Sequence, residues 1–193
     1  EIWSDIILPG HKHIPTQSVS EDARMRTVAL YAPSKTFNLA GLVGSYHIIY
    51  NEPLRDRVCA VSNKTHYNEM NVLSMHALIG AYQPQGYEWV DELNQVLAGN
   101  IEYFCDYVDE HFEGVSYSRP QGTYMVFLDC TEWCREHGRD IQWLLDEGAR
   151  VGVGYQDGRP FHGPCHIRVN LALPLSRVRE ACDRLDRYVF NAR

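Results

Sequence analysis

Residues 32–42 read Ala32-Pro33-Ser34-Lys35-Thr36-Phe37-Asn38-Leu39-Ala40-Gly41-Leu42, and Lys35 is the only charged residue among them. The stretch follows a short apolar run, Thr27 to Tyr31, with the composition of a strand, and Pro33 ends that run. A single lysine in a loop is nearly always a solvated surface charge. Apolar neighbours, however, favour the uncharged amine, which is the nucleophilic form. Spacing alone leaves both interpretations of Lys35 open.

Outside this stretch, patterns of strand and helix follow one another. A polar segment, residues 18–26, predicts a short helix or turn, and the aromatic and β-branched residues 45–50 predict a strand. Apolar side chains at helical spacing predict three helices: one opening near Pro53, one capped by Asn68, and a long one over about residues 87–112 that Gly114 stops.

The later part of the chain predicts an α+β unit. Its expected elements are a strand pair over residues 115–128, a short helix over residues 141–145, an extended glycine-rich segment at residues 151–154, an alternating strand at residues 166–171 and a last helix opened by Pro174. Pro84-Gln85-Gly86 predicts a break in the chain. Two domains, residues 1–85 and 86–193, are therefore expected.

Composition excludes several classes of protein. The net charge of −7 lacks the basic excess that nucleic-acid binding usually needs. No apolar run approaches the roughly 20 residues needed to span a membrane, and no signal peptide is evident, so a cytoplasmic protein without membrane contact is expected. The first residues, Glu1 to Asp5, read as a strand that runs into a loop without an initiator Met. The chain is therefore expected to begin inside a larger polypeptide.

The six cysteines are scattered, and reduced thiols are the expected state. Cys130, Cys134 and His137 could be interpreted as part of a metal site, but the spacing has no matching second half, so no metal is expected. His11 and His13 flank Lys12, and an active-site loop and a plain surface loop remain equally open for them.

Four collinear stretches resemble pyridoxal-phosphate (PLP) enzymes of the fold-type-I aminotransferase superfamily, class I and II. Within it they resemble the cystathionine β-lyase or C–S lyase (MalY/PatB-like) group. The stretches are Ser34 to Leu42; Glu1-Ile2-Trp3-Ser4-Asp5-Ile6-Ile7 with residues 10–15 behind it; Pro120-Gln121-Gly122-Thr123-Tyr124 leading into Leu128-Asp129; and His166-Ile167-Arg168-Val169-Asn170-Leu171-Ala172. The resemblance covers essentially the whole chain.

The resemblance implies an α/β fold of the PLP-dependent transferase type. Residues 1–85 would be the C-terminal portion of the large PLP-binding domain, and residues 86–193 the small C-terminal domain. The intact enzyme would be a homodimer that acts on an amino-acid substrate. The chain would supply about half of that enzyme, its C-terminal half.

The resemblance also implies roles for particular residues. Lys35 would carry PLP and, once freed by substrate, would act as the base at Cα. Arg168 would clamp the substrate carboxylate, although without the family a surface arginine is the better interpretation. Ser34, Asn38 and Trp3 would contact the cofactor, with a turn role for Ser34 and Asn38 and a core role for Trp3 as equal alternatives.

The sequence departs from the family's pattern at several positions. The family's aspartate that pairs with the pyridine nitrogen directly precedes the Glu1-Ile2 dipeptide. Trp3 stands where relatives often have His or Tyr. Val43 occupies the place of a phosphate-binding arginine, and Ala32 that of a serine. These departures predict that the 193 residues alone are inactive.

For the parent enzyme the lysine stretch favours C–S β-elimination from cystathionine or a cysteine conjugate, which yields a thiol, pyruvate and ammonia. An aminotransferase is the alternative, because it shares the first proton removal. A non-catalytic fragment or protein-binding module of the same fold is a further alternative.

Overall fold

The computed structural model describes residues 1–66 and 68–192. The chain divides into two compact units, Glu1–Asn94 and Gln95–Arg193. Helix α5 (Pro84–His111) begins in the first unit and ends in the second. Both units combine helices with strands, as the α/β expectation requires.

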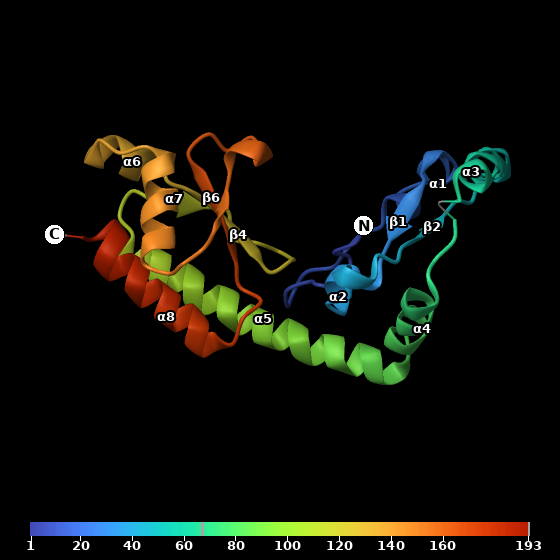
Figure 1. Ribbon diagram of the computed structural model, residues 1–193, viewed down its shortest axis with the longest axis horizontal. Coiled ribbons are helices and arrows are strands. Elements are labelled where there is room, and N and C mark those ends of the chain that lie inside the picture. Colours follow the sequence, from blue (N-terminus) through green and yellow to red (C-terminus); the bar gives the residue numbers. More distant parts are fainter. Residues whose placement is uncertain (67, 193) are drawn as a thin grey trace. The chain divides into compact units, whose positions relative to one another are not determined.

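The first unit combines two short strands with several helices (Figure 1). They are η1 (Thr16–Ser18), α1 (Glu21–Arg26), β1 (Ala29–Tyr31), α2 (Pro33–Thr36), η2 (Ala40–Leu42), β2 (Tyr46–Ile48), α3 (Glu52–Thr65), α4 (Val72–Ala81) and the start of α5. The helix expected near residues 18–26 and the strands expected near residues 27–31 and 45–50 are thus confirmed. The lysine segment, expected as a loop, instead opens with the helical turn α2.

Strands β1 and β2 pair in antiparallel register, with Leu30 opposite His47. Ala29 is buried, whereas Leu30 and Ile48 are 54% and 39% exposed. A two-stranded sheet is at best marginally stable without further packing. Ile48 pairs with Ala29 and Leu30 with His47, so each face of this small sheet keeps one exposed apolar side chain.

Helix caps explain where α3 and α4 begin. The Asn51 side chain accepts a hydrogen bond from the Leu54 amide, and Pro53 occupies the first turn of α3 as expected. The expectation that Asn68 caps the next helix is wrong. Asn71 is the cap, because its side chain accepts the Ser74 amide, while Asn68 donates to Asn63 instead.

The expected chain break at Pro84-Gln85-Gly86 is also wrong, because these residues form the first turn of α5. Proline at the start of a helix costs no hydrogen bond, so Pro84 opens the helix rather than ending one. A Cβ at Gly86 would lie 1.8 Å from the Ala81 carbonyl oxygen, so the glycine serves close packing between α4 and α5. Assignment of residues 1–85 and 86–193 to two enzyme domains stays a proposal.

The second unit is built on a four-stranded antiparallel sheet in the order β3-β4-β6-β5. Its elements after α5 are β3 (Ser116–Tyr117), β4 (Met125–Asp129), α6 (Thr131–His137), α7 (Ile141–Arg150), β5 (Gln156–Asp157), η3 (Arg159–Phe161), β6 (His166–Asn170), α8 (Leu175–Leu185) and a π-helical turn, η4 (Asp186–Phe190). The expected strand pair, alternating strand and last helix are confirmed. Helix α6 was not expected.

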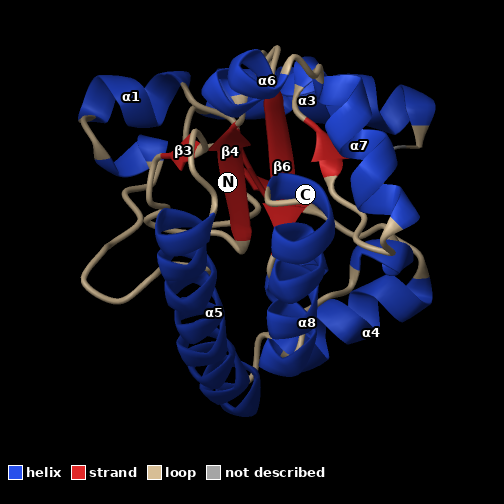
Figure 2. Ribbon diagram, turned by 90° about the vertical axis from the view of Figure 1, so that its left-hand side faces the viewer, coloured by secondary structure: helices blue, strands red, loops and turns tan. Residues whose placement is uncertain are grey.

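Buried and more exposed side chains alternate along the two central strands, β4 and β6, and the buried ones form part of the core of this unit. Val126 and Leu128 of β4 and Ile167 and Val169 of β6 are buried, while their neighbours in sequence are more exposed. Helices α5 and α8 run side by side in both ribbon views (Figures 1 and 2). Apolar residues of these helices, Leu97, Ile101, Phe104, Val178, Cys182 and Leu185, complete the core.

Gly114, with φ of +79°, follows the end of α5 and adopts the left-handed conformation that commonly terminates helices. In the part of the chain that the structure describes, no helix is long and apolar enough to cross a membrane.

Candidate functional site

Lys35 lies on the single helical turn α2 and is half-buried. Pro33 opens this turn, and the Phe37 amide closes it by donating to the Pro33 carbonyl at 2.9 Å. The Lys35 Nζ atom lies 5.5 Å from the centre of the Trp3 indole ring. Two residues from separate stretches of the sequence are thus brought together, and an amine is held beside an aromatic face.

The residue after Lys35 ties α2 to the N-terminal segment. Thr36 is 1% exposed, and its hydroxyl donates to Asp5 Oδ2 at 2.9 Å. The Asp5 carbonyl oxygen in turn accepts a hydrogen bond of 2.9 Å from the Asn94 side chain on α5. The segment that supplies Trp3 is therefore fastened both to the lysine-bearing turn and to α5.

Ser34 and Asn38 flank the lysine. Ser34 is half-buried, and its carbonyl oxygen accepts the Leu39 amide at 3.1 Å. Asn38 is exposed and has a φ of +53°, a left-handed conformation that asparagine tolerates better than most residues. This backbone geometry gives Asn38 a turn role at the end of the lysine segment.

A second polar cluster in the first unit centres on the Glu1 carboxylate. It accepts hydrogen bonds from the Tyr31 hydroxyl at 2.8 Å and the Thr16 amide at 2.8 Å, and His13 Nε2 lies 3.2 Å away. Burial alone would raise the pKa of Glu1, but these hydrogen bonds outweigh it and lower the pKa to about 2. Burial and the bond to Glu1 raise the pKa of Tyr31 to about 12.

The two histidines that flank Lys12 differ in their surroundings. His13 is the member beside Glu1, whereas His11 is exposed. In the ranges 1–66 and 68–192, no group of three or more His, Cys, Asp or Glu side chains could hold a metal ion.

Arg168 belongs to the second unit, on β6. It alternates with the buried Ile167 and Val169 and so points away from the core face. Its Nη1 donates to Gln156 Oε1 at 2.9 Å, and its Cζ lies 4.8 Å from the centre of the Phe161 ring. Within the described residues no carboxylate forms an ion pair with Arg168, so an oriented guanidinium is available for an anion.

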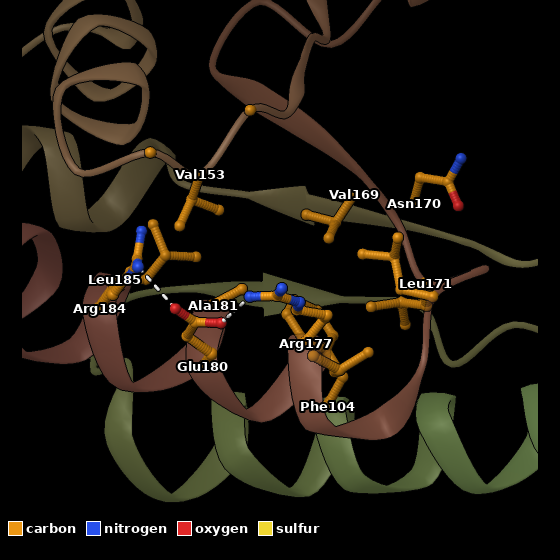
Figure 3. A pocket seen from close by; sticks show the side chains of 14 residues that line it. Phe104, Val153, Val169, Asn170, Leu171, Arg177, Glu180, Ala181, Arg184 and Leu185 are labelled. Atoms are coloured by element: carbon orange, nitrogen blue, oxygen red, sulfur yellow. Dashed lines mark hydrogen bonds and ion pairs between the residues drawn. The ribbon is translucent and has the colours of Figure 1, made fainter.

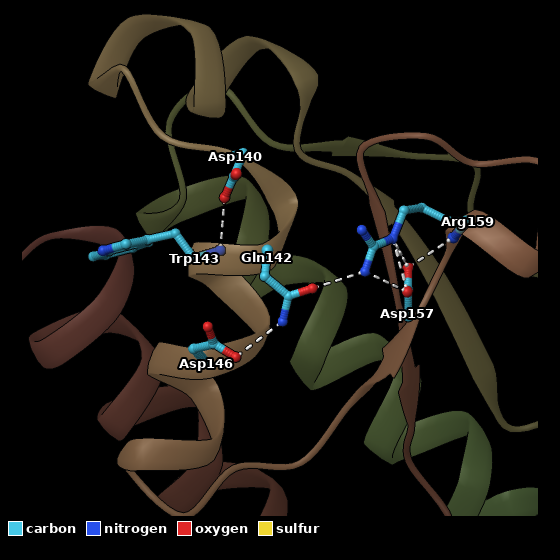
Figure 4. Close-up of polar contacts among 6 residues, drawn as sticks. All are labelled: Asp140, Gln142, Trp143, Asp146, Asp157 and Arg159. Atoms are coloured by element: carbon cyan, nitrogen blue, oxygen red, sulfur yellow. Dashed lines mark hydrogen bonds and ion pairs between the residues drawn. The ribbon is translucent and has the colours of Figure 1, made fainter.

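A polar network holds the residues that orient Arg168 (Figure 4). The Asp157 carboxylate forms an ion pair with Arg159, with N–O distances down to 2.7 Å, and also accepts the Arg159 backbone amide. Arg159 donates onward to Gln142 on α7, which donates to Asp146. The ion pair lowers the pKa of Asp157. The network fixes the segment from Gln156 to Phe161 against α7.

A cavity of about 370 Å³ lies on the other face of β6, above α8 (Figure 3). Its walls are mostly apolar and include Phe104, Val169, Leu171 and Val178, and Glu180 bridges Arg177 and Arg184 at its rim. None of the residues expected for the site from the sequence lines it.

Sequence reasoning missed the Asp5–Thr36 pair and the Glu1 cluster. Both Asp5 and Thr36 belong to stretches that the resemblance singled out, yet their pairing joins residues 31 positions apart. The sequence predicted only a strand at Tyr31, whose hydroxyl donates to Glu1, 30 positions earlier in the chain. Nothing in local spacing signals such contacts.

Comparison with known proteins places the chain in a family. The model of the family described as aminotransferase class I and II matches residues 1–185. Cystathionine beta-lyase PatB of Bacillus subtilis (strain 168) is 29% identical over 188 residues, which cover 96% of this chain and 47% of PatB. Protein MalY of Escherichia coli (strain K12) is 32% identical over 183 residues, which cover 93% of this chain and 45% of MalY.

Among solved structures, a PLP-bound putative aminotransferase from Clostridium difficile 630 superposes with a TM-score of 0.86 at 30% identity, over 96% of this chain and 47% of that protein. This likeness confirms the expected PLP-dependent transferase type of fold. The chain spans about half the length of the curated relatives it matches.

Proposed function

Because the chain belongs to the aminotransferase class I and II family, we propose that the intact protein is a PLP-dependent enzyme that cleaves the C–S bond of an amino-acid substrate. The observation that carries the proposal is that Lys35 is half-buried and its Nζ lies 5.5 Å from the centre of the Trp3 ring. Cystathionine, or a cysteine conjugate of similar shape, is the proposed substrate. The products would be a thiol, pyruvate and ammonia.

The residues around Lys35 fit the cofactor. Within the described residues no carboxylate pairs with the amine, which leaves it available to react with an aldehyde. The indole of Trp3 offers a flat apolar surface for an aromatic ring. We assign Lys35, Trp3, Ser34 and Asn38 to cofactor binding on this basis together with the family resemblance. Asn38 contributes mainly by shaping the turn.

PLP, when bound, supplies an electron sink that stabilises negative charge at the substrate Cα. Lys35 would hold the cofactor through its amine and, once freed by the substrate, would take the Cα proton. The electron pair left at Cα would form a double bond to Cβ while sulfur leaves with the electrons of the C–S bond as a thiolate, and water would convert the remaining three-carbon fragment to pyruvate and ammonia. Lys35 would therefore act twice, first as the nucleophile that holds the cofactor and then as the base at Cα.

Arg168 holds the substrate's α-carboxylate in this proposal. A planar guanidinium can offer two parallel N–H donors to a carboxylate. Gln156 and Phe161 fix its plane before substrate arrives, so less side-chain freedom is lost on binding. The orientation of Arg168 by neutral groups leaves its charge for the substrate.

Transamination is the second candidate function. The similarity to a protein described as a putative aminotransferase, at 30% identity, favours it. The similarity to PatB, named a cystathionine beta-lyase, favours elimination at almost the same identity. The lysine stretch, with Asn38 to Leu42 as its second half, supports elimination.

We propose that the intact enzyme is a cytoplasmic homodimer. Exposed apolar side chains on α4, among them Val72 at 64% and Leu73 at 71%, support contact with further polypeptide. All six cysteines are free, which supports a reducing compartment. Residues 1–85 would contribute to its large domain and residues 86–193 would form its small domain.

Turnover assays on the intact protein test the proposal. Elimination predicts release of thiol and pyruvate from cystathionine without any keto acid, whereas transamination predicts amino transfer that requires one. Lys35→Ala should abolish turnover, while Lys12→Ala and Lys64→Ala, which remove the chain's other two lysines, should not. Undiminished turnover by Lys35→Ala would overturn the proposal.

A further inference from the structure

The turn that carries Lys35 is too short to orient itself. Helix α2 has four residues, so its own hydrogen bonds hold little more than one turn. Its backbone closes through the Phe37 amide to Pro33 and the Leu39 amide to Ser34. Contacts from side chains must therefore fix the rotation of the turn about its axis.

Thr36 provides such a contact. Its side chain is almost completely buried, and its hydroxyl donates to Asp5 at 2.9 Å. Successive residues of a helix project about 100° apart. Fixing Thr36 on one side of α2 therefore fixes the direction in which Lys35 leaves the turn.

The acceptor of this bond lies on the segment that supplies the aromatic partner of Lys35. Asp5 is two residues after Trp3, and Asn94 anchors its carbonyl oxygen. The hydrogen bond from Thr36 to Asp5 thus fixes the position of the lysine-bearing turn relative to the segment that contains Trp3. All of these residues belong to the first unit.

We propose that Asp5 and Thr36 are a positioning pair that holds the Lys35 amine beside the Trp3 ring, in the place where the cofactor reacts with it. The proposal rests on the function proposed above for Lys35. Neither residue contacts the reacting atoms: both act through the direction of the lysine. Without the pair, α2 can turn and the amine moves into solvent.

The first test needs no cofactor. Brief acetylation of the protein with acetic anhydride, followed by peptide mass mapping, gives the reactivity of Lys35 relative to Lys12 and Lys64, which serve as internal references. Thr36→Val keeps the branched shape but loses the hydroxyl, and should raise the relative labelling of Lys35 about threefold as its aromatic contact is lost. Thr36→Ser restores the donor and should return the ratio to the wild-type value.

Asp5→Ala removes the acceptor and should produce the same change as Thr36→Val. The double variant should add nothing, because both substitutions break one contact. Thr65→Val, at the exposed end of α3, is the control and should leave the ratio unchanged. The proposal would be overturned if the labelling of Lys35 relative to Lys12 and Lys64 were unchanged in both Thr36→Val and Asp5→Ala. Additive effects in the double variant would also overturn it.

The second test uses PLP and the intact protein. Thr36→Val should weaken PLP retention about tenfold, the effect of losing one buried hydrogen bond, whereas Thr36→Ser should stay near wild type. Wild-type retention by a folded Thr36→Val protein contradicts the positioning role. Failure of the wild-type protein to attach PLP at Lys35 would instead contradict the proposed function, whatever the acetylation ratios show.

Discussion

The Lys35 amine and the Trp3 indole lie 5.5 Å apart, although 31 residues separate them in the chain. This contact predicts that Trp3 contributes to cofactor retention. Trp3→Phe keeps an aromatic face and should retain PLP nearly as well as wild type. Trp3→Ala should weaken retention about tenfold, through the lost contact between the indole and the cofactor ring. Equilibrium dialysis of the intact protein against PLP measures the difference, with Trp143→Ala in the second unit as the control. Retention of PLP by Trp3→Ala equal to that of the wild type would contradict the assignment.

Arg168 should govern substrate affinity rather than chemistry. Arg168→Gln removes the charge and one half of the expected bidentate contact, and should raise KM for the amino-acid substrate about 100-fold with a smaller loss in kcat. Arg168→Lys should recover only part of the affinity, because an ammonium cannot offer the planar pair of donors. Steady-state kinetics of the intact enzyme test this, with Arg179→Gln on α8 as the matched control. A KM unchanged by Arg168→Gln would show that another residue binds the carboxylate.

The Glu1 cluster predicts a specific loss of stability in acid. The pKa of Glu1 falls from an ordinary 4.5 to about 2 in the folded chain. A lowered folded-state pKa stabilises the protein fully above pH 4.5, and this contribution is lost as pH falls toward 2. Glu1→Gln should therefore reduce stability by about 1–2 kcal/mol at pH 6 and make no difference near pH 2. Thermal denaturation at a series of pH values tests this, and a Glu1→Gln deficit that persists unchanged to pH 2 would contradict it.

The backbone at Val43 is strained, and we expect a substitution to glycine to relieve that strain. It has a φ of +53° and is 85% exposed, so a β-branched residue occupies a left-handed conformation without buried contacts that would offset the cost. Val43→Gly should stabilise the protein by about 1 kcal/mol, and Val43→Ala should give much less. Urea denaturation of the three proteins measures the effect. Destabilisation by glycine would mean that Val43 makes contacts in the intact protein that outweigh its strain.

Much of the fold follows from local signals in the sequence. Alternation over residues 166–171 predicted β6, and helical spacing over residues 87–112 predicted most of α5, because each pattern repeats over enough residues. The wrong predictions concern helix boundaries that depend on a single residue. Asn68 and Asn71 are equivalent as caps until tertiary packing selects one, and Pro84 could either end or open a helix.

The candidate site was predictable only in part. The resemblance pointed to Lys35, Trp3 and Arg168, because their neighbours form recognisable stretches. Contacts that orient them could not be predicted in this way. The bonds from Thr36 to Asp5 and from Arg168 to Gln156 join residues 31 and 12 positions apart, and the fold alone brings them within reach.

The most direct measurement is borohydride reduction of the intact protein with bound PLP, followed by mapping of the labelled peptide. Within this chain the lysines are Lys12, Lys35 and Lys64, and peptide mapping distinguishes Lys35 from these two and from any other lysine of the intact protein. The proposal predicts a visible absorption band that borohydride abolishes, with the label on the peptide that contains Lys35. Absence of the band, or a label on any lysine other than Lys35, would contradict the assignment of Lys35 as the lysine that carries the cofactor.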